Sequence, residues 1–283
     1  MFSKICYRLT YINSKKGWCL MEKKEQVHLE RSIDLSSALA LVIGTVIGSG
    51  IFFKQASVLS YSHSTTLALL AWFLGGVLTL TSGLTIAEIG SQMPQTGGLY
   101  IYMHNLYGKI WGFLSGWMQI TVYGPAVIAA LGAYLAILLQ AFFGFDQSLT
   151  PYVGVLSVIL ISLFNFLANR FGSALQIITT LCKLLPIALI IIFGLLFGDQ
   201  NALGQVLATQ AATPAGNFGV AILATLFAYD GWILIANMGG EIKNPQKILP
   251  LAIILGLSAV LVIYVLVSYG IFKTMPAEMI QRY

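Results

Sequence analysis

The chain has 283 residues, of which 58% are hydrophobic and only 9% are charged, and its mean hydropathy is +0.85. Soluble domains carry about 25% charged residues, so this composition excludes a soluble globular protein and indicates an all-α integral membrane protein. The net charge of +5 is not gathered on a folded soluble face, which argues against nucleic-acid binding.

Residues 1–34 form the first predicted region, a cytoplasmic N-terminal tail. The tail holds seven of the fifteen basic residues and lacks the apolar stretch of a signal peptide. A start assigned too early would explain the unusual opening of the chain, with Met21 as the alternative start. The three cysteines, Cys6, Cys19 and Cys182, show no metal-binding spacing and imply neither a metal site nor a disulfide framework.

Seven membrane-spanning helices are predicted after the tail, because a span needs about 20 mostly apolar residues. The predicted spans cover residues 35–59, 65–89, 111–140, 151–169, 172–198, 217–240 and 249–272. With the N-terminus inside, eleven basic residues lie inside, three lie outside, and Lys183 lies within the membrane. Since short cytoplasmic loops are enriched in Lys and Arg, the pattern predicts a multi-pass protein of the cell membrane with a cytoplasmic N-terminus.

The first predicted span carries a glycine-rich stretch at residues 44–52, GTVIGSGIF. Glycine costs about 1 kcal/mol relative to alanine inside a helix, so this stretch is a weak point. A helix interrupted here frees N–H groups that suit a carboxylate. Those N–H groups belong to Gly48, Ser49, Gly50 and Ile51. In the alternative interpretation, which this stretch supports equally well, Gly44 and Gly48 form a G-x-x-x-G packing face.

The loop over residues 90–110 is rich in turn formers and aromatic residues. A proline and a pair of glycines break any helix that leaves the second span. Three tyrosines of this loop, Tyr100, Tyr102 and Tyr107, are predicted to anchor an interfacial segment on the cytoplasmic side. A gating role is the alternative for the same segment.

A second discontinuity lies in the sixth predicted span, at residues 226–232, LFAYDGW. An aspartate such as Asp230 near the middle of the membrane costs about 2.5–3.5 kcal/mol, so it is expected to face a cavity or a partner. Two interrupted helices of opposite direction, five spans apart, indicate an inverted-repeat transporter. This second break favours the ligand-site interpretation of residues 48–50 over the packing face.

Several motifs together resemble those of one family. Residues 47–52 (IGSGIF) resemble the first-span signature of permeases in the amino acid–polyamine–organocation superfamily. Residues 227–232 (FAYDGW), followed by 241–245 (EIKNP), resemble the sixth-span signature of its L-type amino acid transporter branch. Residues 88–100 resemble the loop after the second span in that branch. The resemblance covers almost the whole chain after the tail, and it is greatest to bacterial serine/threonine exchangers.

The resemblance implies a fold of twelve spans, built from two inverted repeats of five. In that family the broken first helix binds the substrate carboxylate, here through the N–H groups of residues 48–51. The broken sixth helix binds the α-amino group through the carbonyls of Phe227, Ala228 and Tyr229, whereas Asp230 falls where the family varies. The implied activity is sodium-independent exchange or proton-coupled uptake of neutral amino acids, without a cofactor.

Length departs from the family pattern. The first repeat covers residues 35–198 and only 217–272 of the second is present, so the permease domain at 35–283 is expected to be truncated after about seven spans. A nonfunctional fragment is one alternative. An integral-membrane enzyme has little support, because G-x-S-x-G, H-E-x-x-H and Walker A motifs are absent from the sequence. The expected partners are an amino acid and the lipid bilayer, and the sequence indicates no particular protein partner.

Lys183 lies in the fifth predicted span at a depth of roughly 16–18 Å, beyond comfortable snorkelling. We expect an interior cation, and a lysine in a local water defect is the alternative. The resemblance implies that this lysine takes the place of a bound sodium ion. The other ionisable side chains are predicted to be solvated or isolated, although a gate partner is an equal alternative for Glu88. They are Glu88, Glu241, Lys243, Lys247, His63 and His104.

Overall fold

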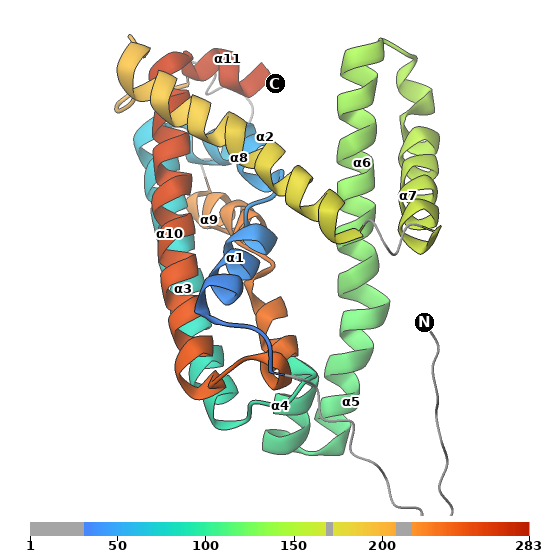
Figure 1. Ribbon diagram of the computed structural model, residues 1–283. Coiled ribbons are helices and arrows are strands. Elements are labelled where there is room, and N and C mark those ends of the chain that lie inside the picture. The colour runs from blue at the N-terminus through green and yellow to red at the C-terminus, as the bar shows by residue number, and fades with distance from the viewer. Residues whose placement is uncertain (1–30, 168–171, 208–216, 283) are drawn as a thin grey trace, which may run out of the picture.

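The computed structural model describes residues 31–167, 172–207 and 217–282, which form helices joined by short connections (Figure 1). The predicted tail falls almost wholly outside these residues. The elements are α1 (Leu35–Val46), α2 (Gly50–Ser62), α3 (Thr65–Gln92), α4 (Gly98–Tyr107), α5 (Lys109–Met118), the π-helix η1 (Gln119–Tyr123), α6 (Gly124–Phe143), the 3-10 helix η2 (Gln147–Leu149), α7 (Thr150–Leu167), α8 (Gly172–Phe197), α9 (Phe218–Ala228), the 3-10 helix η3 (Trp232–Glu241), α10 (Pro245–Thr274) and α11 (Ala277–Arg282).

Helices occupy all seven predicted span positions, with bounds that differ by a few residues. Five stretches are long and apolar enough to cross a membrane alone, and α1 with α2 forms a sixth span bent by 47°. The remaining predicted span position is occupied by α8, in which Cys182–Phe197 forms a shorter apolar segment. The prediction of an all-α, multi-pass fold with a broken first span is therefore confirmed.

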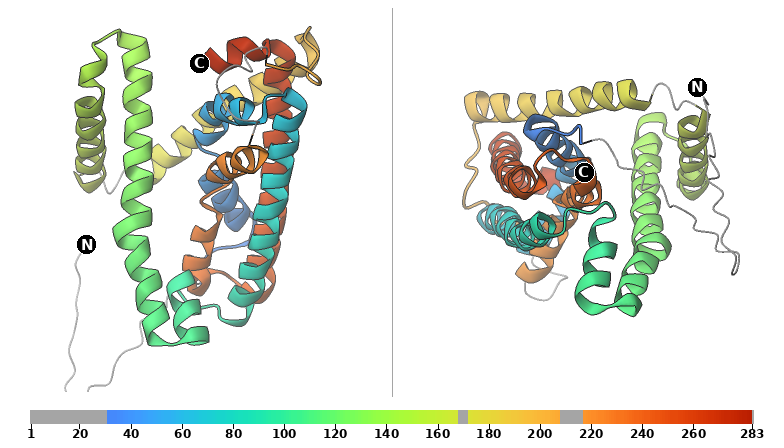
Figure 2. Two further views of the ribbon diagram at one scale, coloured as in Figure 1. Left: turned by 180° about the vertical axis from the view of Figure 1, so that it is seen from behind. Right: turned by 60° about the horizontal axis from the view of Figure 1, so that its bottom comes forward.

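Spans one, two, six and seven form a bundle around one apolar core (Figure 2). The most extensive contact between two helices joins α3 to α10. Three glycines of α3, each seven residues from the next, face α10 there. A Cβ at Gly76, Gly83 or Gly90 would lie 2.6–2.7 Å from a leucine carbon of α10. These glycines therefore set how closely the two helices approach.

Spans one and six run in opposite directions. At the end of the molecule where α4 lies, Ile33 N donates to Glu241 O at 3.0 Å and Lys243 N donates to Ile33 O at 2.8 Å. Span one therefore begins where span six ends. Farther along, α2 packs against α9. We call the two ends of the molecule the α4 end and the α11 end, after the short helix found at each (Figure 1).

Asp34 starts span one as the N-cap of α1. Its carboxylate accepts a hydrogen bond from Ser37 N at 2.9 Å, and the hydroxyl of Ser36 also donates to it. Hydrogen bonds from Ser37, then Ser36, lower the pKa of this exposed carboxyl to about 2. The cap therefore stays ionised at neutral pH and favours a helix that begins at Leu35.

The third span is continuous from α5 through η1 to α6, and with α7 it forms an arm beside the bundle (Figure 2). Gly132 and Gly154 bring α6 and α7 into contact, because a Cβ on Gly154 would lie 3.3 Å from Gly132 O. The helix α8 then crosses the bundle and packs on α10. The arm contacts α4 through α5, and side chains near the breaks in spans one and six, described below, also join it to the bundle.

The loop after span two packs against the bundle, which corrects one prediction. Tyr102 is 1% exposed, and a Cβ on Gly90 would lie 2.8 Å from its hydroxyl. Only Tyr100 and Tyr107 are exposed, as an interfacial anchor requires. The prediction was wrong for Tyr102, because the loop folds back until Gly97 N donates to Asn237 O of η3 at 3.2 Å.

A leucine at Gly83 should separate α3 from α10. We expect Gly83→Leu to lower the melting temperature by several degrees, since overpacking a tight contact costs about 1–3 kcal/mol. Ser82→Leu is the matched control, because it adds the same side chain at the neighbouring exposed position. Equal melting curves for the two variants in detergent would contradict the packing described here.

Candidate functional site

The break in span one lies where the glycines predicted it. The helix α1 ends at Val46, and Ile47 leaves the helical conformation with a ψ of 99°. The helix α2 then begins at Gly50 at 47° to α1. The first turn of a helix has N–H groups without intrahelical partners, so α2 presents the positive end of its dipole at this point.

Span six is broken at the same level. The helix α9 ends at Ala228, and η3 begins after Gly231, whose φ of +107° disfavours any side chain. A Cβ there would also lie 2.7 Å from Thr45 O in the last turn of α1. The glycine of the sequence YDG thus permits both the turn and the close contact between the two spans.

The two breaks touch each other. A Cβ on Gly50 would lie 2.9 Å from Ala228 Cα, so the start of α2 rests directly on the end of α9. Among the described residues, Gly44 has no atom within 4 Å of its Cβ position, and Gly48 has only the backbone oxygen of Val46 at 3.9 Å. These residues therefore give the alternative of a Gly44–Gly48 packing face no support, and Gly50 is the glycine of this stretch whose Cβ position lies against another span.

One hydroxyl lies between the carbonyls of both broken helices. Tyr264 of α10 is fully buried, and its hydroxyl lies 2.9 Å from Val46 O and 2.9 Å from Ala228 O. A hydroxyl donates one hydrogen, so the two C-terminal carbonyls share it. Tyr264 is not among the predicted site residues, although a tyrosine within an otherwise apolar span is a signal.

A buried polar network supports α2 next to the break. Gln55 Nε2 donates to Ser268 Oγ at 2.8 Å and to Ile51 O at 3.0 Å, and Trp72 Nε1 donates to Gln55 Oε1 at 3.2 Å. Both ends of the glutamine amide are thus satisfied, as a buried amide requires. Residues from α2, α3 and α10 hold the start of α2 in place.

The predicted span-six residues face different surroundings. Tyr229 is 1% exposed and points into the bundle, where its hydroxyl donates to Trp72 O at 3.0 Å. Asp230 instead accepts a hydrogen bond from the Tyr123 hydroxyl, at the end of the π-helix in span three. Asp230 and Phe227 both line a cavity of about 710 Å³, which we call the α4-side cavity.

Aromatic rings cover the other side of the break. Phe53 of α2 stacks on Tyr134 of α6 with ring centroids 3.4 Å apart, and its centroid lies 6.0 Å from that of Phe227. Lys54 Nζ lies 4.9 Å from the centroid of the Phe227 ring, within the range of a cation–π interaction. Phe227 therefore lies between these rings and the α4-side cavity.

Lys183 reaches span one from α8. Its side chain is partly buried, and Nζ donates to Gly44 O at 2.5 Å, on the turn of α1 before the break. The ammonium thus lies inside the molecule, which favours an interior cation over a lysine in a lipid-facing water defect.

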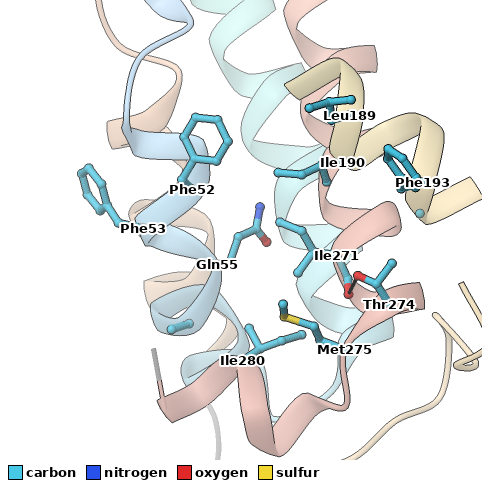
Figure 3. Close-up of a pocket in the computed structure, with 12 residues that line it drawn as sticks. Phe52, Phe53, Gln55, Leu189, Ile190, Phe193, Ile271, Thr274, Met275 and Ile280 are labelled. Atoms are coloured by element: carbon cyan, nitrogen blue, oxygen red, sulfur yellow. Dashed lines mark hydrogen bonds between the residues drawn. The ribbon is translucent and has the colours of Figure 1, made fainter. Parts of the chain in front are cut away.

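A second cavity, of about 480 Å³, lies near the α11 end between α2, α8, α10 and α11 (Figure 3). Gln55 and Thr274 are its polar side chains, and both already donate to neighbouring oxygens. This cavity offers apolar contact and contains none of the predicted site residues.

Comparison with known proteins places these observations in a family context. Residues 33–282 match the family model of the amino acid permeases. The chain is 50% identical over 250 residues to the serine/threonine exchanger SteT of Bacillus subtilis, covering 88% of this chain and 56% of that protein. It is 32% identical over 262 residues to the mouse b(0,+)-type amino acid transporter 1, covering 89% and 53% of the two chains. The human cystine/glutamate transporter is 29% identical over 264 residues, covering 90% and 52%.

The chain spans about half the length of the curated relatives it matches. The match begins near the start of span one and includes both broken spans. Each of these relatives is named as a transporter or exchanger.

Removing the Tyr264 hydroxyl should loosen both breaks together. We expect Tyr264→Phe to increase amide hydrogen exchange near Val46 and Ala228, since an unpaired buried carbonyl costs about 1–3 kcal/mol. Tyr269→Phe on the same helix is the control, measured by mass spectrometry in lipid nanodiscs. Faster exchange at only one of the two breaks would show that the hydroxyl does not hold both.

Proposed function

The chain belongs to the amino acid permease family, and from this premise we propose that it carries the substrate site of a secondary transporter for neutral amino acids. The transport is sodium-independent exchange or proton-coupled uptake across the cell membrane. The observation that carries the proposal is the contact between Gly50 and Ala228, where two broken spans of opposite direction meet. Inverted-repeat transporters bind substrate at such breaks.

Helix ends supply both charges that a zwitterion needs. The N–H groups of Gly48, Ser49, Gly50 and Ile51 lie at the positive end of α2 and suit the α-carboxylate. The carbonyls of Phe227, Ala228 and Tyr229 lie at the negative end of α9 and suit the α-ammonium. The carbonyl of Ala228 keeps one lone pair for substrate, because a carbonyl oxygen has two and Tyr264 uses one.

Lys183 takes the role that a sodium ion plays between spans one and five of sodium-dependent carriers. The geometry that supports this role is the contact of its ammonium with Gly44 O, because the cation joins α8 to α1 directly before the break. A fixed ammonium supplies the positive charge without any ion from solution.

The orientation and the repeats complete the proposal. The α4 end faces the cytoplasm, with residues 1–34 as a cytoplasmic tail. Residues 35–198 form the first repeat and residues 217–272 begin the second. Support comes from the basic residues of the tail and of the connections at the α4 end, such as Lys243, which lies beside the start of span one.

A methyl group at Gly50 should weaken binding of a zwitterionic amino acid. We expect Gly50→Ala to weaken binding of L-serine or L-threonine at least tenfold, because the added Cβ displaces Ala228 and alters the backbone site. Gly44→Ala is the control, since its Cβ meets open space. Radioligand binding in nanodiscs with matched melting temperatures measures the effect. Equal affinities for both variants would overturn the assigned site.

Sodium should have no influence on binding. We expect the L-serine affinity to change less than twofold when choline replaces sodium, and Lys183→Gln to weaken it at least tenfold. Lys273→Gln is the matched control, because Lys273 Nζ also donates to a carbonyl, Leu195 O at 2.9 Å, but near the α11 end. A steep sodium dependence of the unsubstituted protein would contradict the role of Lys183.

A further inference from the structure

Lys54 is a charged residue of span one to which the proposed function gives no role. It lies in the second turn of α2, four residues after Gly50, so the two residues share one face of that helix. On this face Gly50 rests on Ala228, the last residue of α9. The side chain of Lys54 is half-buried, so it lies against neighbouring parts of the protein instead of extending freely.

Aromatic rings surround the ammonium of Lys54. Its Nζ lies 4.9 Å from the centroid of the Phe227 ring and 5.6 Å from that of the Phe53 ring. Both distances fall within the range of about 6 Å over which a ring face attracts a cation. Within the ranges that the structure describes, the ammonium thus contacts rings from both broken spans. The attraction strengthens as water is excluded, and partial burial of the lysine favours it.

The two rings differ in how firmly they are held. The Phe53 ring stacks on Tyr134 of span three with centroids 3.4 Å apart. The Phe227 ring is tilted against Phe53 with centroids 6.0 Å apart, and it borders the α4-side cavity on its other side. Since the cavity gives Phe227 less packing on that side, the position of its ring depends more on Lys54.

Two contacts therefore join the start of α2 to the end of α9, and they act in opposite ways. The close approach of Gly50 to Ala228 sets the smallest separation of the two helix ends, because no atom lies between them. It does little to prevent a larger separation. The contact of Lys54 with Phe227, one turn farther along α2, is attractive and opposes such a separation.

We propose that Lys54 is a positioning residue, whose ammonium holds the Phe227 ring against α2 and thereby keeps the ends of the two broken helices together. The inference deepens the proposed function, and its consequence for ligand binding rests on that function. The N–H groups of α2 and the carbonyls of α9 bind one amino acid only while their spacing is kept, and a site that is already spaced correctly binds more tightly.

The contact itself is tested without a ligand, by a double-mutant cycle on melting temperature in nanodiscs. Lys54→Met removes the charge and keeps the length of the side chain. Replacement of Phe227 by 3,4,5-trifluorophenylalanine removes the attraction of the ring face for a cation and changes its shape little. We expect each change to lower the melting temperature by roughly 1–5 °C, and both together to lower it no further than the larger single change.

Phe52 is the matched control for the fluorinated ring, because it is a half-buried phenylalanine of the same helix that lines the cavity near the α11 end. The same fluorination there should shift the melting temperature equally in the unsubstituted protein and in Lys54→Met. Additive effects of Lys54→Met and the fluorinated Phe227 would show that the two side chains act independently, which would overturn the proposal.

The consequence for the site is tested by radioligand binding of L-serine. We expect Lys54→Met to weaken binding at least fivefold and Lys54→Arg to stay within twofold of the unsubstituted protein, because arginine keeps the charge over the ring. Lys273→Met is the control, since its ammonium contacts Leu195 O near the α11 end. Equal affinity of Lys54→Met and the unsubstituted protein would contradict the positioning role.

The two measurements separate this proposal from the proposed function. Coupled melting temperatures in a protein that does not bind L-serine would leave the contact of Lys54 with Phe227 standing and overturn the proposed function. Additive melting temperatures in a protein that binds L-serine would overturn only the role of Lys54.

Discussion

The hydrocarbon interior of a membrane offers no water to backbone groups, and this constraint governs the centre of the molecule. Each break in a span frees N–H and C=O groups that cost several kcal/mol if unpaired. The two breaks are placed together, and α10 contributes the Tyr264 hydroxyl to the carbonyls of both. Lys183 donates to Gly44 O one turn earlier. In the part of the chain that the structure describes, the backbone groups that these two side chains pair are carbonyls.

The arm made by spans three and four meets the bundle on both sides of these breaks. Phe53 and Tyr134 join them through an apolar stack, and Asp230 and Tyr123 join them through a hydrogen bond. Any movement of the arm relative to the bundle must change the ring stack, the hydrogen bond or both. The stack is apolar, whereas the hydrogen bond borders the α4-side cavity.

Sequence was sufficient for the spans and their breaks because hydropathy and glycine act locally. Residues 44–52 and 226–232 each carry the signal for a break within a few residues. The contacts that hold the breaks depend on residues far away in the chain: Gln55 and Ser268 are 213 positions apart, and Tyr264 and Val46 are 218 apart. A single tyrosine or glutamine in an apolar span resembles an ordinary core or interfacial residue, so no local pattern predicts its partner. The binding roles of residues 48–51 and 227–230 remain predictions, since the geometry places these residues together but contains no substrate.

The two charges near the centre differ in how freely their partners can be exchanged. The ammonium of Lys183 donates to a backbone carbonyl, Gly44 O, and this oxygen moves only if α1 moves. Asp230 is tied to a side-chain hydroxyl, which rotates away at little cost and exposes the carboxylate to the cavity. Lys183 therefore joins α8 to α1 through a backbone oxygen, whereas Asp230 joins span six to span three through side chains alone.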